Sequence, residues 1–153
     1  MYYINILCIL NEKKNMIQVY KNILIKTSRQ KIIDITQNIN NFVDENKLNN
    51  GILLAYILHT SASLLVQENA DPNVLKDLEK FFNKLVPMGN KYYHHSEGID
   101  DMPAHIKSVL TNTSLSFSIQ NKQIVLGSWQ AIYLYEHRLI QKDRYITLHF
   151  LGD

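Results

Sequence analysis

The chain has little of several residue types that would by themselves define a class of protein. Its 153 residues include one cysteine, Cys8, which excludes an internal disulfide and a zinc site built from several thiolates. Five glycines and three prolines are too few for a collagen-like or low-complexity chain. The chain also has little excess of either charge, because sixteen Lys and Arg against fourteen Asp and Glu leave a net charge of only +2. This balance argues against nucleic acid and anionic membranes as partners.

No apolar run is long enough to span a bilayer as a helix, which takes about twenty residues. The run 1–10 is closed by the polar stretch 11–15 and lacks the basic start and small residues of a signal peptide. We therefore expect a cytoplasmic protein. With 46% hydrophobic residues the chain can bury a core, and its length fits one domain, which we place at 16–153 after an N-terminal extension at 1–15.

The first half of the domain alternates strand and helix patterns. Apolar residues at odd positions predict a strand over 16–26 with one wet face. A helix is predicted from a cap at Thr27 or Ser28 to near Leu48. The run 51–58 has no polar alternation and predicts a strand buried on both faces. After a strand over 63–67, Asp71 caps a helix with Pro72 at its first position, and Pro87 stops it.

The second half predicts a short helix and a meander of strands. Pro103 lies at the start of the helix, which continues to Leu110. Strands follow at Ser114–Ile119, Gln123–Leu126, Gln130–Glu136 and Tyr145–Leu151. Segregated helices and strands without a Gly-rich phosphate loop predict an α+β domain with two main helices and a short third helix.

The strongest group of ionisable residues runs from His94 to His105, through the expected loop 90–102 and into the first turn of the helix that follows it. Asp101 and His105 are four residues apart across a helix start, so that one face can carry both. Imidazoles and carboxylates are usual ligands of divalent cations, and His59, at the end of the strand 51–58, could join His94 and His105 as a third ligand. The wide spacing matches no standard metal motif, so a solvated surface loop remains an alternative.

Two further segments carry groups that could bind an anion or a ring. The segment 59–63 places an imidazole beside three hydroxyls, which could bind a phosphate or simply satisfy turn amides. Trp129 could lie in the core or, beside Gln130, stack on a flat ligand. Arg138 could grip phosphate or lie on the surface.

Three blocks in a fixed order, HTSASLLVQENADP, YYHHSEGIDDMPAHIKSVL and IVLGSWQAIYLYEHR, resemble the YjbQ-like family, also labelled secondary thiamine-phosphate synthase. The resemblance runs from about Gln18 to Gly152. It implies an α+β fold of mixed β-sheets, assembled as a homotrimer with polar pockets near subunit boundaries. Ser128, Ala131, Met88 and Tyr135 depart from the family's usual residues.

The resemblance also implies a function and a set of site residues. The family is similar to enzymes that join an aminopyrimidine pyrophosphate to a thiazole phosphate and release pyrophosphate, so the expected partner is a small phosphorylated or anionic metabolite. A divalent metal, Mg²⁺ or Zn²⁺, could assist. Alternatives are a metal-dependent hydrolase and a non-catalytic trimeric metabolite-binding protein. Carried over by position, the expected catalytic residues are His59, His94, His105, Asp101 and Glu97, and the expected ligand-binding residues are Thr60, Ser61, Glu68, Asn69, Trp129, Gln130, Glu136 and, from its own chemistry, Arg138.

Overall fold

The computed structural model describes residues 15–89 and 92–153. Residues 1–14 of the expected extension, and Asn90 and Lys91 of the expected loop, lie outside the described residues. No helix in the described ranges is long and apolar enough to cross a membrane.

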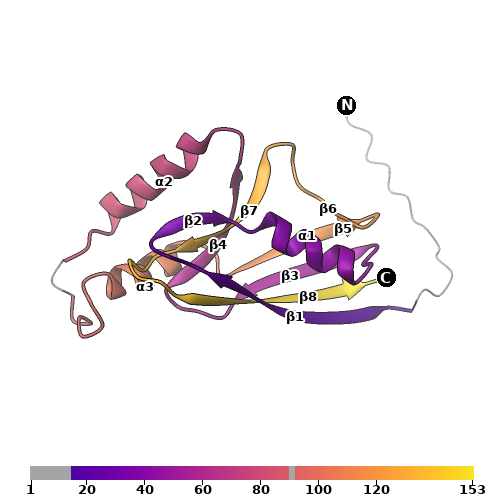
Figure 1. The fold of residues 1–153 in the computed structure, drawn as a ribbon, viewed down its shortest axis with the longest axis horizontal. Coiled ribbons are helices and arrows are strands. Elements are labelled where there is room, and N and C mark those ends of the chain that lie inside the picture. Colours follow the sequence, from indigo (N-terminus) through magenta and orange to yellow (C-terminus); the bar gives the residue numbers. More distant parts are fainter. Residues whose placement is uncertain (1–14, 90–91) are drawn as a thin grey trace, which may run out of the picture.

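In the described residues, eight strands form two sheets, with three helices outside them (Figure 1). The five-stranded sheet has the order β1-β8-β3-β5-β6, and the three-stranded sheet has the order β2-β7-β4. Every strand pair in the described ranges is antiparallel, so the sheets are not mixed in direction as the resemblance implied. The α+β class is confirmed, and the described residues hold three helices. The third helix is not shorter than the first, because α1 and α3 have ten residues each and α2 has fourteen. The elements in chain order are β1 Ile17–Lys26, β2 Lys31–Asp34, α1 Thr36–Glu45, β3 Gly51–Ile57, β4 Ala62–Glu68, α2 Pro72–Leu85, α3 Asp101–Leu110, β5 Ser114–Gln120, β6 Gln123–Ile124, β7 Gln130–Glu136 and β8 Asp143–Gly152.

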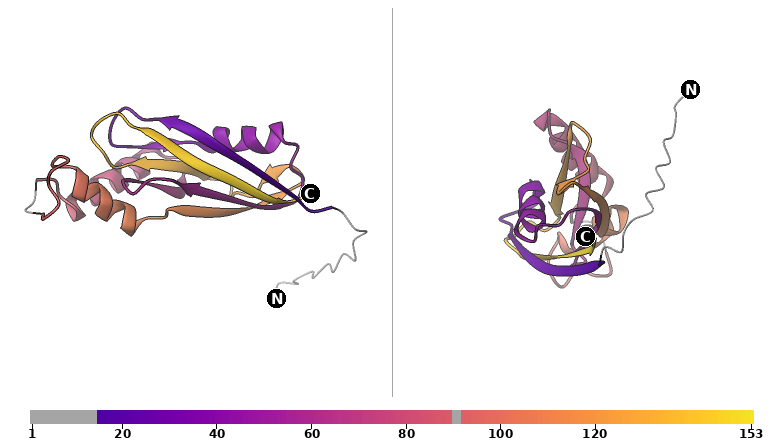
Figure 2. Two further views of the ribbon diagram at one scale, coloured as in Figure 1. Left: turned by 90° about the horizontal axis from the view of Figure 1, so that it is seen from below. Right: turned by 90° about the vertical axis from the view of Figure 1, so that its right-hand side faces the viewer.

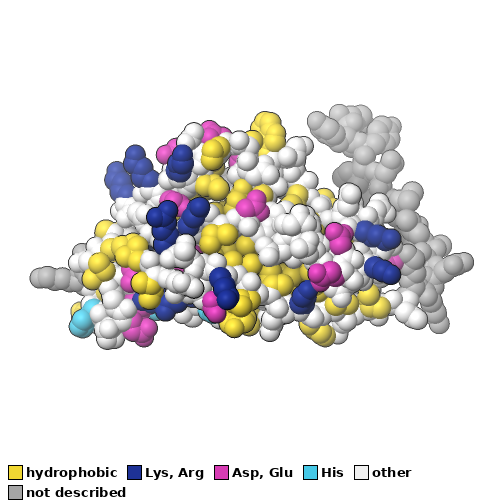
Figure 3. All heavy atoms as spheres, viewed as in Figure 1, with side chains coloured by type: hydrophobic (Ala, Val, Ile, Leu, Met, Phe, Trp, Pro, Cys, Tyr) yellow, Lys and Arg dark blue, Asp and Glu magenta, His cyan; other side chains and the backbone are white. Residues whose placement is uncertain are grey.

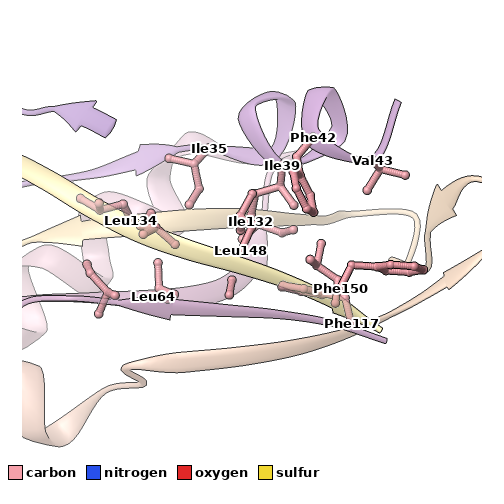
Figure 4. Close-up of a cluster of buried hydrophobic side chains, with 14 of the residues drawn as sticks. Ile35, Ile39, Phe42, Val43, Leu64, Phe117, Ile132, Leu134, Leu148 and Phe150 are labelled. Carbon is pink, nitrogen blue, oxygen red and sulfur yellow. The ribbon is translucent and has the colours of Figure 1, made fainter. Parts of the chain in front are cut away.

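The core fills the space between the inner faces of the two sheets and α1 (Figure 4). Helix α1 contributes Ile39, Phe42 and Val43. Strand β7 contributes Ile132 and Leu134, and strands β3, β8 and β5 supply most of the opposite wall. A second, smaller cluster lies on the outer face of the three-stranded sheet, where Leu75, Leu78 and Phe82 of α2 pack on Ile32, Ala131, Tyr133 and Tyr135.

Three details of the predicted elements are wrong. The first helix does not begin at Thr27 or Ser28, because 31–34 forms the edge strand β2 beside β7 and the helix starts at Thr36. The strand 51–58 is not buried on both faces: Leu53, Ala55 and Ile57 point into the core, whereas the alternate residues are exposed. The later strands do not form a meander, since β7 joins β2 and β4 while β8 inserts between β1 and β3.

The remaining elements agree with the sequence. Asp71 caps α2 by accepting a hydrogen bond from the Asn73 N–H, and Pro72 occupies the first turn. Helix α2 ends at Leu85, before Pro87. Helix α3 begins at Asp101, so Pro103 lies within its first turn and His105 one turn after Asp101.

Candidate functional site

The structure brings together His94, Asp101 and His105, with one ligand atom from each residue inside a span of 4.8 Å. Asp101 is almost fully buried, whereas His105 is half-buried and His94 is exposed. His94 Nε2 lies 2.6 Å and His105 Nε2 3.5 Å from the same oxygen, Asp101 Oδ2. Both imidazoles and one carboxylate therefore face a common point at the start of α3. Figure 3 shows histidine and acidic side chains at the end of the molecule that carries this loop.

The orientation of His105 is fixed by a backbone hydrogen bond. Its Nδ1 lies 2.9 Å from the Thr60 carbonyl oxygen, which can only accept, so the proton resides on Nδ1. The lone pair of Nε2 is then directed toward Asp101. A hydrogen bond from the far ring nitrogen to a carbonyl is the arrangement that orients histidine ligands in metal sites.

Arg138 fixes the acidic part of the site from beneath. This buried guanidinium donates to Asp100, to Asp101 Oδ1 and to the Glu97 carbonyl oxygen. Because Oδ1 of Asp101 is engaged by Arg138, Oδ2 is the oxygen left facing the histidines. Burial raises the pKa of Asp100, but the Leu139 N–H and the Arg138 guanidinium outweigh this and lower it below its ordinary value. Arg138 is thus a positioning residue and does not reach solvent to grip a phosphate.

His59 is not part of the three-residue group. Its Nε2 accepts a hydrogen bond from the Tyr145 N–H at 2.8 Å, so Nε2 cannot be a metal ligand in this arrangement and the proton lies on Nδ1. Burial, and then the Arg144 cation, lower the pKa of His59, which keeps it neutral at pH 7. The structure therefore assembles Asp101 with His94 and His105 in place of the expected trio with His59.

His59 and His105 instead border a common hollow of about 380 Å³. Tyr56, Thr60 and Val109 also line it. A neighbouring hollow of about 500 Å³ shares Tyr56, His59 and Thr60. The histidine and acid group thus lies beside a space with one aromatic wall and several polar groups.

Other expected ligand-binding residues have internal roles. Glu136 is fully buried and accepts hydrogen bonds from Arg144, from the Thr27 hydroxyl and from the Arg138 N–H. Ser61 Oγ accepts from Arg144 as well. Glu97 is exposed, and only its carbonyl oxygen takes part in the site.

Glu68, Asn69, Trp129 and Gln130 form a separate group at the other end of the β4–β7 ladder. Glu68 pairs with Gln130, and six residues further along Ala62 pairs with Glu136. At about 3.4 Å per residue the two ends are roughly 20 Å apart. Trp129 is 67% exposed, so it is not a core residue, and its carbonyl oxygen accepts the Asn69 N–H. Within one chain this group does not meet the histidines.

Sequence reasoning did not identify the buried Arg144–Glu136 ion pair. It also missed the buried pair of Ser63 and His137, whose Oγ and Nε2 are 2.9 Å apart. His137 follows β7 directly and Ser63 lies on the adjacent strand β4. The available sequence signal for the burial of His137 was that it continues the residue alternation of the buried strand β7. Its partner could be identified only from strand register.

The two-sheet α+β fold, with a histidine and acid group at the start of α3, defines a class of small antiparallel α+β proteins. The chain belongs to the YjbQ family, since the family model described as UPF0047 protein YjbQ-like matches residues 21–153. It is 42% identical over 132 residues to UPF0047 protein sll1880 of Synechocystis sp., covering 86% of this chain and 90% of that protein. UPF0047 protein YjbQ of Escherichia coli O157:H7 is 43% identical over 115 residues, covering 75% and 83%.

Solved structures agree with this assignment. A crystal structure of a YjbQ/UPF0047-family protein from Clostridium acetobutylicum has a TM-score of 0.78 and 34% identity, covering 85% of this chain and 98% of that one. A YbjQ-like protein from Sulfolobus solfataricus has a TM-score of 0.83 at 22% identity, covering 91% and 100%, and shows the fold alone.

Proposed function

We propose that this protein is a metal-dependent enzyme that hydrolyses a small phosphorylated or otherwise anionic metabolite. The observation that carries the proposal is the convergence of His94, Asp101 and His105 within 4.8 Å, with Asp101 held by Arg138 and His105 held by Thr60. Three protein ligands that leave coordination positions open are typical of catalytic metal sites.

The donor set favours a transition metal over Mg²⁺. Imidazole suits Zn²⁺, Fe²⁺ and related ions, and two histidines with one carboxylate are a recurrent catalytic set, whereas Mg²⁺ prefers oxygen ligands. A metal bound here would supply Lewis acidity and lower the pKa of its water. Asp101 would provide its Oδ2 oxygen while Arg138 retains Oδ1.

The hollow beside His105 supports a substrate with a ring or apolar part next to its anionic group. His59 presents Nδ1–H as a donor, since its Nε2 is engaged by Tyr145. Tyr56 and Val109 supply apolar surface, and Thr60 supplies a hydroxyl. An oxygen of the substrate could accept from His59 while the remainder packs against Tyr56.

A second candidate is the thiamine-phosphate synthase-like transfer that the family resemblance implies, in which a thiazole phosphate displaces pyrophosphate from an aminopyrimidine. The aromatic wall at Tyr56 beside the donors of His59 and Thr60 supports it. Release of pyrophosphate usually relies on Mg²⁺ held by carboxylates. Two imidazoles among the three converging groups fit that requirement less well than they fit hydrolysis.

The proposal includes assembly as a homotrimer, which the resemblance implies. The outer face of the five-stranded sheet supports it: viewed from below in Figure 2, no helix crosses these strands. Ile52, Leu54 and Tyr56 of β3 point outward from this face, and Tyr20, Leu24, Leu58, Tyr145 and Leu151 are also exposed on it. Exposed apolar side chains gathered on one sheet face, here set among polar residues such as His149 and Thr147, are typical of a protein interface.

The test is metal titration followed by turnover. Metal-stripped protein titrated with Zn²⁺ by calorimetry should bind one equivalent per chain, and His105→Ala should weaken binding by at least about tenfold. His95→Ala is the matched control, because His95 is exposed, its Nδ1 bonds to the Tyr93 carbonyl oxygen, and it is not part of the three-residue group. Loaded protein should hydrolyse a chromogenic phosphate or carboxylic ester.

The outcomes separate the candidates. Product from the two thiamine precursors in the presence of Mg²⁺, with no ester hydrolysis, would favour the transferase. A metabolite that raises the melting temperature without being converted would favour a binding protein. Absence of stoichiometric metal, or equal metal binding by His105→Ala and wild type, would refute the proposed metal centre.

A further inference from the structure

A hollow of about 430 Å³ lies apart from the histidine and acid group, where the start of β2 meets helix α2 and the loop between β7 and β8. Figure 3 shows Lys and Arg side chains gathered over β2 and α2, with a few acidic side chains among them. Three segments that are distant in the sequence line the hollow, through Arg29, Gln30, Lys31, Lys76, Glu79 and Leu139.

The hollow has an excess of positive charge. Three of its six lining side chains are cations and one is an anion, which leaves a formal charge of +2. Within residues 15–89 and 92–153, the side chains of Arg29 and Lys31 form no hydrogen bond or ion pair. Lys76 Nζ donates at 3.3 Å to the Asn73 amide oxygen, which is a neutral partner. A bound anion would relieve the repulsion among these cations.

Glu79 is the one acidic group of the hollow, and the fold uses only one of its oxygens. Glu79 Oε1 accepts the Ile32 N–H at 2.8 Å, which ties α2 to the edge of β2 that is not paired with β7. This bond holds the carboxylate in place at the wall of the hollow. No donor in the described part of the chain reaches Glu79 Oε2, which is therefore an acceptor available to a ligand.

We propose that this hollow binds a small sugar phosphate. Its phosphate accepts hydrogen bonds from Arg29, Lys31 and Lys76, since a guanidinium pairs with two phosphate oxygens and ammonium groups add point charges. A hydroxyl of the sugar donates to Glu79 Oε2. Because the same carboxylate repels a bare anion, it selects a phosphate that carries hydroxyl groups over inorganic phosphate.

The size and position of the hollow support a ligand of this class. Ligand pockets typically measure about 300–1,000 Å³, so that about 430 Å³ leaves room for a sugar beside the phosphate. Leu139 supplies apolar surface for the carbon skeleton. The Leu139 N–H donates to Asp100, so the hollow adjoins the segment that holds the metal centre but shares no side chain with the three-residue group.

Ribose 5-phosphate is the probe for the test. Calorimetric titration of the full chain should show one equivalent bound per chain with a Kd below about 1 mM. Inorganic phosphate should bind at least about fivefold more weakly, because it has no hydroxyl group on a carbon skeleton to donate to Glu79, and ribose without phosphate should not bind measurably.

Variants connect this binding to the hollow. Arg29→Gln, at an exposed position where the change should not disturb folding, should weaken ribose 5-phosphate binding at least about tenfold. Lys84→Gln is the matched control, because Lys84 is exposed and lies two turns further along α2 than Lys76, about 12 Å away. His105→Ala removes a ligand of the proposed metal centre and should also leave the affinity unchanged, which separates the two sites.

Glu79→Gln tests the choice of ligand, since the glutamine keeps an amide oxygen for the Ile32 N–H but removes the negative charge. Inorganic phosphate should then bind more tightly, and the preference for ribose 5-phosphate should fall at least about threefold. The proposal is overturned if wild type does not bind ribose 5-phosphate, if Arg29→Gln binds it as tightly as wild type, or if His105→Ala abolishes the binding. Equal affinity of wild type for inorganic phosphate and ribose 5-phosphate would overturn the assignment of a sugar phosphate.

Discussion

At the scale of single residues, the two buried arginines differ in what they hold. Arg144 pairs with Glu136 inside the core, whereas Arg138 connects the loop before α3 to the end of β7 through Asp100, Asp101 and the Glu97 carbonyl. Arg138 therefore holds the acidic side chains of the candidate metal centre in place, although it would not itself be a metal ligand.

We expect Arg138→Gln to lower the free energy of unfolding by about 3 kcal/mol, because it leaves Asp100 and Asp101 buried without their counter-charge. Urea unfolding measures this change. Lys21→Ala is the control: its ion pair with Glu45 has an N–O distance of 2.6 Å but is exposed, so its loss should cost less than about 1 kcal/mol. Equal losses in the two variants would contradict the positioning role.

His137 should make the fold sensitive to mild acid. Burial, with the nearby Lys107 and Arg144 cations, lowers its pKa from the ordinary 6.5 to about 3. Below pH 6.5 the unfolded chain binds a proton that the folded chain does not, so stability present above that pH is lost progressively as pH falls toward 3. The expected slope is about 1.4 kcal/mol per pH unit.

Urea unfolding between pH 6.5 and 5 tests this slope before most carboxylates titrate. His137→Gln should flatten the profile relative to wild type, while His95→Gln, at an exposed histidine, should leave it unchanged. The idea fails if wild type and His137→Gln have parallel profiles.

At the scale of elements, the loop before α3 depends on one glycine. Gly98 has φ of +117°, a conformation that side chains with Cβ rarely adopt, and a Cβ there would lie 3.1 Å from Asp100 Oδ1. Gly98→Ala should therefore destabilise the protein by about 1–3 kcal/mol and weaken metal binding.

The control for this strain is Gly89, which also has positive φ, +69°, but where an added Cβ would meet no atom of the described residues within 4 Å. Gly89→Asn should cost only a few tenths of a kcal/mol, because Asn tolerates that region. Thermal unfolding and zinc titration of both variants decide the point, and equal behaviour of the two would contradict it.

Element type could be predicted from sequence where the local signal and the packing agreed. Asp71 and Pro72 marked the start of α2 correctly because cap and first turn are local features. The start of α1 was wrong because Ile32, Ile35 and Ile39 fit a helical stripe, while Ile32 and Ile33 are in fact held by pairing with β7. That pairing joins residues about a hundred positions apart and leaves no local trace.

The candidate site was predictable to a similar degree. Asp101 and His105 lie on one turn of α3, and their four-residue spacing indicated this. That His94 would reach Asp101, and that His59 would instead accept from Tyr145, depends on how the loop and β8 fold back. These are tertiary contacts, which spacing alone does not specify.

At the scale of the whole molecule, one face of the five-stranded sheet is unexplained by the single chain. Strand β3 read as an uninterrupted apolar run, yet Ile52 is 60% and Tyr56 46% exposed. The prediction of burial on both faces was therefore wrong for the isolated chain. In the proposed trimer the outward residues of β3 would be covered, and the absence of polar alternation would have a physical reason.

We expect the wild-type protein to elute with about three times the 17.9 kDa mass of the chain in size-exclusion chromatography with light scattering. The double variant Ile52→Lys and Leu54→Lys should be monomeric, because two ammonium groups would be buried at each interface. Its far-ultraviolet circular dichroism should remain that of wild type, since both side chains point away from the core within one chain. Asn38→Lys adds the same type of charge to the exposed surface of α1 and should remain trimeric. A monomeric wild type, or a trimeric double variant, would show that this face is not the interface.

Since Tyr56 lines the hollow next to His105 and belongs to the same row of outward residues, loss of the trimer should also change substrate binding while zinc affinity remains unchanged.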